Sequence, residues 1–340
     1  MDWSKIHYSR APVWASGPLG FLSFLYGLGV QIKTKASDGR TRKSLPGFVV
    51  SIGNITTGGT GKTPAVILSR GYGGNYREKV LEVPEASDGS ATASLVGDEP
   101  YLLKRNLVGV PIMISRDRYL AGSAAHHKYG VQFFILDDGF QHIRLKRDLD
   151  LVLLDASNPF GNGYLLPLGP LREPVDHLNR ADAFILTRCG EVESPRALGF
   201  LGKKFPKKPV FEADHLPGQV VFPLTREAHP GEWLRGKRVI AFAGIARPES
   251  FRKTLEQLGA RVMLFRAFRD HHSYRIEELS YFLEEREKQR ADLIITTEKD
   301  WARMGHLDTG RTELAYLTVR FVLLGEEDRF FAMIRERMEL

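Results

Sequence analysis

The strongest chemical signal in the sequence is a glycine-rich segment at residues 51–64. It contains Gly-Gly-Thr-Gly-Lys-Thr and directly follows a short apolar run at residues 47–50. An apolar run that leads into such a loop is typical of a strand, a phosphate-binding loop and the start of a helix. The sequence therefore predicts a binding site for a nucleoside triphosphate, and a glycine-rich turn with a chance lysine is the alternative.

The expected roles within this loop follow from the residue types. Its glycines let backbone N–H groups point inward at phosphate oxygens, which a Cβ would obstruct. Lys62 is expected to reach the β- and γ-phosphates, and the hydroxyl of Thr63 to ligate Mg²⁺. The residues that we predict to contact ATP here are Thr57, Gly58, Gly59, Thr60, Gly61, Lys62 and Thr63. The loop is a variant, because Thr56 stands where the pattern Gly-x-x-x-x-Gly-Lys-Ser/Thr has its first glycine.

Two carboxylates, Asp137 and Asp138, end a continuous apolar run at residues 133–136. This is the form of a Walker B strand, whose acidic end holds the magnesium ion of a nucleotide. In open parallel sheets, ligands bind at the carboxyl ends of the strands, where the phosphate loop would also lie. The pair therefore predicts a Mg²⁺ site, and structural capping by one aspartate is the alternative.

Three further segments offer groups that could do chemistry. Asp98 directly precedes a helical pattern, so its position fits either a helix cap or a general base. An Asp-His-His cluster at residues 270–272 follows an expected strand, which favours a functional role over a packed histidine. A Gly- and Pro-rich loop at residues 158–174 carries Arg172 and Glu173 at its tip, and long loops of this kind are usually functional.

The composition is that of an ordinary globular protein. The chain has 340 residues, 43% of them hydrophobic and 26% charged, which is enough for two domains with full cores. The net charge of +7 fits phosphorylated substrates, an anionic membrane face or nucleic acid, and by itself selects none of them. The single cysteine, Cys189, excludes an intrachain disulfide and a cysteine-rich metal site, so a reducing compartment is expected.

The N-terminal region is unusually apolar. Residues 11–30 carry no charge, but Pro12 and Pro18 are expected to leave only about fourteen helical residues, too short for about 30 Å of hydrocarbon. We therefore predict that residues 1–35 form a membrane-associating interfacial helix, with a helix packed on its own domain as the alternative. The basic residues placed to meet anionic headgroups are Lys33, Lys35, Arg40, Arg42 and Lys43.

The rest of the chain alternates between expected strands and helices, which predicts an α/β fold of two α/β/α domains. The first, at residues 36–209, is a phosphate-loop domain with a parallel sheet. The second, at residues 236–340, repeats the strand–helix alternation. A proline-punctuated linker at residues 210–235 lies between them, and its pieces at residues 210–213 and 219–222 are expected to pair as a β-hairpin.

The segment after the phosphate loop is shorter than expected. A parallel crossover ordinarily needs a helix of about ten residues or more, yet only residues 64–70 precede the glycine-rich run that begins at Gly71. Pro64 suits the first position of a helix, where its missing N–H is not needed. We therefore expect at most two helical turns there, which is the start of a helix without its body.

Together these segments resemble the tetraacyldisaccharide 4'-kinase family, the lipid A 4'-kinases of Gram-negative inner membranes. The resemblance runs from the N-terminus to about Trp301 and includes the variant Thr56. The matching stretches are residues 53–64, 68–74, 97–100, 136–142, 168–174, 270–272 and 297–300. The family has a full helix and a further strand after the loop, so the short segment before Ser69 departs from it.

The resemblance implies transfer of the γ-phosphate of ATP to the 4'-hydroxyl of a tetraacyldisaccharide 1-phosphate, which makes lipid IVA. It implies that Asp98 is the base that accepts the hydroxyl proton, oriented by His271, with Lys62 as a third catalytic residue. The other implied nucleotide contacts are Arg70, Tyr72 and Arg172, and the implied Mg²⁺ site comprises Thr63, Asp137, Asp138, Gln141 and Glu173. The expected protein lies peripherally on the cytoplasmic face of the inner membrane, and no obligate protein partner is evident.

Three other classes of protein share some of these sequence features with the kinase family. A partitioning-type ATPase would carry a lysine just before the paired glycines, where this chain has Thr57. A membrane protein that keeps the fold and has lost catalysis is suggested by the short segment after the loop. Nucleic acid is not expected as a partner, because no reader motif and no aromatic platform accompany the basic residues.

Overall fold

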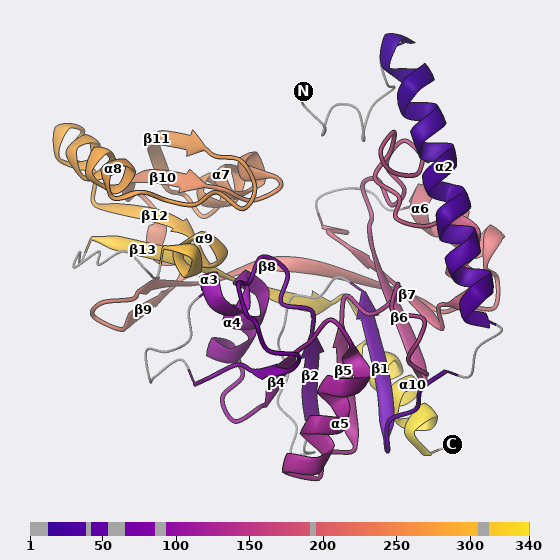
Figure 1. The fold of residues 1–340 in the computed structure, drawn as a ribbon. Coiled ribbons are helices and arrows are strands. Elements are labelled where there is room, and N and C mark those ends of the chain that lie inside the picture. The colour runs from indigo at the N-terminus through magenta and orange to yellow at the C-terminus, as the bar shows by residue number, and fades with distance from the viewer. Residues whose placement is uncertain are drawn as a thin grey trace.

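The computed structural model describes residues 13–38, 42–53, 65–85, 93–190, 195–304 and 313–339. In this part of the chain, thirteen strands form one sheet of order β11-β10-β12-β13-β8-β7-β6-β1-β5-β2-β4-β3, and β9 pairs with β8. Figure 1 shows the two halves of this sheet lying apart, with β8 and β13 between them. The predicted phosphate loop lies outside the described residues.

The first half of the sheet is parallel except for β3, which pairs antiparallel with β4. Its strands are β1 (Phe48–Gly53), β2 (Ala65–Ser69), β3 (Leu81–Glu82), β4 (Ile112–Ile114), β5 (Phe133–Asp137), β6 (Leu149–Asp155) and β7 (Ala183–Thr187). Its helices are α3 (Ala93–Val96), α4 (Asp98–Asn106), α5 (Arg118–Tyr129), η2 (Val175–Arg180) and α6 (Pro195–Lys204). The apolar strands are buried, as expected of a parallel sheet that is covered on both faces.

Strand register brings the polar ends of three strands to one edge of the sheet. Ile52 of β1 lies opposite Asp137 of β5, and Leu68 of β2 lies opposite Leu136 of β5. The carboxyl ends of β1, β5 and β2 therefore lie side by side. This is the edge at which ligands bind in open parallel sheets.

The segment after the phosphate loop is a strand, so the prediction of a short helix there is wrong. Residues 65–69 form β2, which pairs with both β4 and β5. Val66 and Ile67 are β-branched and buried, which favours a strand over a helix. Because β1 and β2 run parallel on either side of β5, residues 54–64 alone connect them, fewer than the dozen or so that a parallel crossover ordinarily takes.

The second half of the fold begins with a long strand that the sequence did not predict. β8 (Val210–Phe222) is continuous, so the predicted hairpin within residues 210–222 is wrong. Its first residues pair parallel with β7, and most of its length pairs antiparallel with β13. The hairpin is formed instead by β8 and β9 (Glu227–Pro230). The predicted boundaries at residues 209 and 235 stay predictions.

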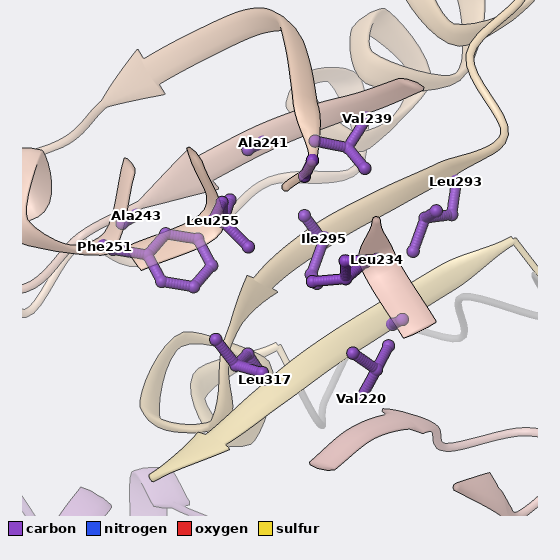
Figure 2. Packing of buried hydrophobic residues seen from close by; sticks show 12 residues of the cluster. Val220, Leu234, Val239, Ala241, Ala243, Phe251, Leu255, Leu293, Ile295 and Leu317 are labelled. Atoms are coloured by element: carbon purple, nitrogen blue, oxygen red, sulfur yellow. The ribbon is translucent and has the colours of Figure 1, made fainter. Parts of the chain in front are cut away.

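The remaining elements are η3 (Gly231–Leu234), β10 (Arg238–Ala243), α7 (Pro248–Gln257), β11 (Arg261–Ala267), α8 (Ile276–Lys288), β12 (Leu293–Thr297), α9 (Glu298–Arg303), β13 (Leu314–Leu323) and α10 (Glu327–Glu339). The predicted alternation of strands and helices between residues 238 and 297 is confirmed, and η3, α9, β13 and α10 are further elements of this half. Figure 2 shows one of their cores, in which Phe251 and Leu255 of α7 pack beside Ala243 of β10 and Ile295 of β12. Phe268, two residues before Asp270, and Trp301 of α9 pack against another buried cluster of this half, which includes Phe242 and Phe282.

The N-terminal helix α2 (Val13–Asp38) runs along the outside of the first half (Figure 1). It has 26 residues and continues through Pro18, so the predicted limit of about fourteen residues is wrong. A proline in the second turn removes only one backbone hydrogen bond. Ser23 Oγ donates to the backbone oxygen of Leu165 at 2.8 Å, and Tyr26 Oη donates to that of Arg172 at 3.0 Å.

The faces of α2 that point away from the protein are apolar. The exposed large side chains are Phe21, Leu22, Phe24, Leu25, Tyr26, Leu28 and Ile32. By contrast, Ser23 and Gly27 are the buried positions among residues 18–36. Within the described residues, no helix combines the length and the apolar character needed to cross a bilayer.

Candidate active site

Asp98 is the first residue of α4, and the glycine before it explains how the helix begins there. Gly97 has a φ of 93°, and a Cβ on it would lie 2.5 Å from the backbone oxygen of Tyr72. Glycine fits both constraints, and it lets α4 begin against the segment that follows β2. Gly97 is the N-cap of α4 and Asp98 is its first helical residue, so the cap interpretation of Asp98 is wrong.

The carboxylate of Asp98 is held by two residues from the second half of the chain. Its Oδ2 accepts a hydrogen bond from Nε of Arg303 at 2.6 Å and lies 3.0 Å from Nδ1 of His271. One oxygen is therefore held by contacts, and the other, Oδ1, makes no hydrogen bond within the described part of the chain.

His271 occupies a turn after β11 in the left-handed region, with a φ of 59°. Its backbone N–H donates to Oδ1 of Asp270 at 2.9 Å, and its side chain is 49% exposed. The ring of Tyr72 approaches it edge-on at 6.4 Å between centroids. The structure thus brings together Asp98, His271 and Tyr72, which the resemblance had placed in one site.

Asp137 is buried at the end of β5. Its Oδ2 accepts a hydrogen bond from Ser69 Oγ at 2.8 Å, and its backbone oxygen accepts one from Nη2 of Arg118 at 3.2 Å. Burial, with the negative charges of Glu99 and Asp138, raises the pKa of Asp137 to about 6. A buried carboxylate of this kind fits a cation, because a nearby positive charge would favour its ionised form.

Asp138 differs from its neighbour in both environment and partner. It adopts a left-handed φ of 47°, and its carboxylate is 47% exposed. Arg172 Nη1 contacts its two oxygens at 2.7 Å and 3.0 Å. Burial alone would lower the pKa of Arg172, and the charge of Asp138 outweighs it and raises that pKa. Arg172, which was predicted to meet the nucleotide, is therefore paired with Asp138 in this structure.

Glu173 is paired with two side chains of η2. Its Oε2 contacts Nδ1 of His177 at 2.7 Å and Nη2 of Arg180 at 2.8 Å. Arg180 also lies over the ring of Phe140, 4.5 Å from its centroid. Phe140 follows directly after the turn at Asp138. Glu173 thus braces the turn that follows β5, and its assignment as a metal ligand stays a prediction.

The other predicted site residues divide into two sets. Arg70 and Tyr72 follow β2, and Gln141 follows β5, so all three lie at the carboxyl edge of the sheet. The predicted phosphate-loop contacts, from Thr57 to Thr63, lie outside the described residues. No cluster of three His, Cys, Asp or Glu side chains suited to a metal ion occurs in the described part of the chain. The five-residue Mg²⁺ set therefore stays a prediction.

Sequence reasoning missed three residues of this site. Arg118 and Ser69 contact Asp137, and Arg303 contacts Asp98. Ser69 ends β2 and Arg118 follows β4, and these strands run parallel and end at the same edge, which could have indicated both residues. Arg303 lies three residues after Asp300, one helical turn beyond the matched stretch at residues 297–300. Nothing in the local sequence indicates that its side chain points toward Asp98.

A mostly parallel sheet, acidic residues at the end of β5 and a Gly-Lys-Thr segment after β1 define an α/β protein of the phosphate-loop kinase class. The family model described as tetraacyldisaccharide-1-P 4'-kinase matches residues 16–339. The chain therefore belongs to the tetraacyldisaccharide 4'-kinase family.

Individual relatives agree with this assignment. A tetraacyldisaccharide 4'-kinase of Syntrophus aciditrophicus is 38% identical over 88% of this chain and 87% of the relative. One of Syntrophobacter fumaroxidans is 41% identical over 88% of this chain and 84% of the relative. A crystal structure of LpxK from Aquifex aeolicus in complex with ATP superimposes with a TM-score of 0.71 at 32% identity, covering 92% of this chain and 96% of that chain.

Proposed function

We propose that this chain transfers the γ-phosphate of ATP to the 4'-hydroxyl of a tetraacyldisaccharide 1-phosphate, the step that makes lipid IVA in lipid A biosynthesis. Its family membership and its likeness to an ATP-bound relative support this activity. The observation that carries the proposal is the arrangement at Asp98. One carboxylate oxygen contacts Arg303 and His271, and within the described residues the other makes no hydrogen bond, so we infer that it meets the acceptor hydroxyl.

Phosphoryl transfer to a hydroxyl group requires few catalytic groups beyond this arrangement at Asp98. Phosphoryl transfer depends mainly on positioning the reactants and neutralising charge on the transferred group. Asp98 would accept the proton of the sugar hydroxyl, and His271 would hold the carboxylate in place as it does so. Lys62 and the loop around it would hold the phosphates of ATP, as the sequence predicts.

Mg²⁺ would be held by Asp137 together with Thr63. Asp137 is the ligand that the structure supports best, because it is buried and its only side-chain hydrogen bond among the described residues comes from the neutral Ser69. Asp138 and Glu173 are already paired with arginine side chains. When bound, the ion supplies positive charge to the β- and γ-phosphates during transfer.

The acyl chains of the substrate give the helix α2 a role at the membrane. We infer that the protein binds peripherally to the cytoplasmic face of the inner membrane through the exposed apolar faces of α2. Phe21 and Phe24 are each 63% exposed and Ile32 is 65% exposed, so burial in lipid would remove a large apolar area from water. Lys33 and Lys35 follow on the same helix, where they could meet anionic headgroups.

A family member that has lost catalysis is the alternative raised by the short connection between β1 and β2. The family match and the relatives span almost the whole chain. The contact between Asp98 and His271 is intact. Both observations favour the active enzyme.

The proposal is tested by incubating the full chain with ATP, Mg²⁺ and a tetraacyldisaccharide 1-phosphate in detergent micelles. Mass spectrometry should show that the lipid gains one phosphoryl group. A matched acceptor that lacks the 4'-hydroxyl should gain none. Hydrolysis of ATP without any phosphorylated lipid would contradict the proposal.

A further inference from the structure

Arg303 is a buried arginine at the centre of the contact between the two halves of the protein. It ends α9, and its side chain is only 5% exposed. Besides the bond from Nε to Asp98, its Nη1 donates to the backbone oxygen of Gly244 at 2.6 Å and to Oδ1 of Asp300 at 3.0 Å. Its Nη2 lies 3.2 Å from Nδ1 of His271. One guanidinium therefore touches both members of the Asp98–His271 pair.

The second half of the chain fixes this guanidinium firmly. Asp300 is fully buried, and its Oδ2 accepts hydrogen bonds from the backbone N–H of Gly244 at 2.9 Å and from Thr297 Oγ1 at 2.7 Å. Burial alone would lower the pKa of Arg303, and the hydrogen bond and charges of Asp98, Asp300 and Asp270 outweigh it and raise that pKa. Arg303 is thus a permanent cation on a rigid support.

The helix α9 that carries Arg303 is packed against α4, which carries Asp98. Arg105 of α4 lies 4.1 Å above the ring of Trp301, and Asn106 Nδ2 donates to Glu298 at 3.1 Å. Ala302 is buried in the core of the first half, beside Tyr101. The spacing between the two helices is therefore set by packing, before any substrate binds.

We propose that Arg303 is the positioning residue of the phosphoryl transfer, which fixes Oδ2 of Asp98 beside His271 so that Oδ1 faces the acceptor hydroxyl. This inference rests on the proposed kinase function. His271 alone could not fix the carboxylate, because its ring is half-exposed and its own backbone is in the left-handed region. A planar guanidinium can donate to several acceptors at once in fixed directions, which a lysine ammonium cannot reproduce.

The proposal predicts that Arg303→Met lowers kcat on the order of 10²-fold, the cost of misplacing a catalytic group by about 1 Å, and leaves the KM for ATP unchanged. Added guanidinium ion at millimolar concentration should restore part of the lost kcat, because the vacated site is lined by Asp98 and Asp300. It should not restore activity to His271→Ala. Arg303→Lys keeps a cation beside the buried Asp300, so it should remain folded. Its kcat should lie between that of Arg303→Met and that of the unmutated chain.

Arg105→Met is the matched control. It removes an arginine from the same α4–α9 interface without touching Asp98, so its kcat should match that of the unmutated chain. Equal losses in Arg105→Met and Arg303→Met would overturn the proposal, as would an unchanged kcat in Arg303→Met. A loss in folded Arg303→Met that guanidinium does not reverse would also overturn it.

Crystal structures of the unmutated chain and of Arg303→Met separate this inference from the proposed activity. The contact of 3.0 Å between Asp98 and His271 should be present in the first and lost in the second. If the unmutated chain shows no lipid phosphorylation but the contact depends on Arg303, the kinase function fails while the positioning role stands. A contact that survives in Arg303→Met overturns the positioning role.

Discussion

The substitution Asp137→Asn is expected to stabilise the nucleotide-free protein at pH 8 while it abolishes phosphoryl transfer. The pKa of Asp137 rises from 3.8 to about 6, chiefly because the residue is buried. At pH 8 the carboxylate is ionised in both the folded and the unfolded chain, and the folded chain bears the cost of the buried charge. The difference between about 6 and 3.8, at about 1.4 kcal/mol per pH unit, corresponds to about 3 kcal/mol.

The sign of the pH dependence follows from the raised pKa. Below pH 3.8 the carboxyl group is protonated in both states and contributes nothing. As the pH rises toward 6, the unfolded chain loses its proton first, so stability is lost over this window and stays lost above it. Asparagine carries no charge and can still accept the hydrogen bond from Ser69. The gain from Asp137→Asn should therefore approach 3 kcal/mol at pH 8 and vanish near pH 4.

Urea unfolding in the presence of EDTA measures this gain at the two pH values. Asp138→Asn is the matched control, because it removes a neighbouring carboxylate that is 47% exposed and paired with Arg172. Loss of an exposed ion pair costs about 0–1 kcal/mol, so this control should gain no stability at pH 8. A gain in Asp137→Asn that is absent at pH 8, or equal at pH 4 and pH 8, would refute the reasoning that burial of the charge sets its pKa.

Two further predictions concern the membrane helix and a buried histidine. The double substitution Phe21→Asp with Phe24→Asp should abolish the co-sedimentation of the chain with anionic vesicles. Val108→Asp, at an 87% exposed apolar residue outside α2, should not. Equal binding by the double variant, Val108→Asp and the unmutated chain would contradict the membrane role of α2. Burial, helped by the charge of Arg118, lowers the pKa of His142 from 6.5 to about 4, so this residue supports the fold above pH 6.5 and its contribution is lost as the pH falls toward 4. His142→Gln should therefore lose less stability than the unmutated chain in thermal melts between pH 6.5 and pH 4, and parallel losses would contradict this.

The sequence predicted the elements whose hydrophobic pattern is unambiguous. The apolar runs before Asp137 and Asp155 are strands, and the helix expected from Pro248 is α7. The hydrophobic pattern of such a run identifies the element from the local sequence alone, whichever distant segment packs against it. The carboxyl edge of the sheet could be predicted from the same pattern.

The elements that failed depend on partners far along the chain. The segment after Pro64 has β-branched residues typical of a strand, although a phosphate loop is ordinarily followed by a helix. β8 reads as two short pieces around Pro217 and Gly218, but β13, about a hundred residues later, pairs with both pieces and makes them one strand. Pairing of this kind cannot be deduced from the local sequence.

The site was predictable by residue type more than by contact. Asp137 and Asp138 are adjacent in sequence, yet one is buried and the other pairs with Arg172, because the chain turns into the left-handed region at Asp138. The contact between Asp98 and His271 joins residues 173 positions apart. Only the resemblance to a family indicated that pair, and nothing in the sequence indicated that Arg303 would join it.

The most direct test of the proposed function is transfer of labelled γ-phosphate from ATP to a tetraacyldisaccharide 1-phosphate by the unmutated chain and by Asp98→Asn. Asparagine keeps the shape of the side chain but cannot accept a proton as a carboxylate does. If Asp98 is the base, the unmutated chain should label the lipid and kcat in Asp98→Asn should fall about 10²–10⁴-fold. Equal labelling by both proteins would contradict the role of Asp98, and no labelling by a folded, unmutated chain would contradict the kinase function itself.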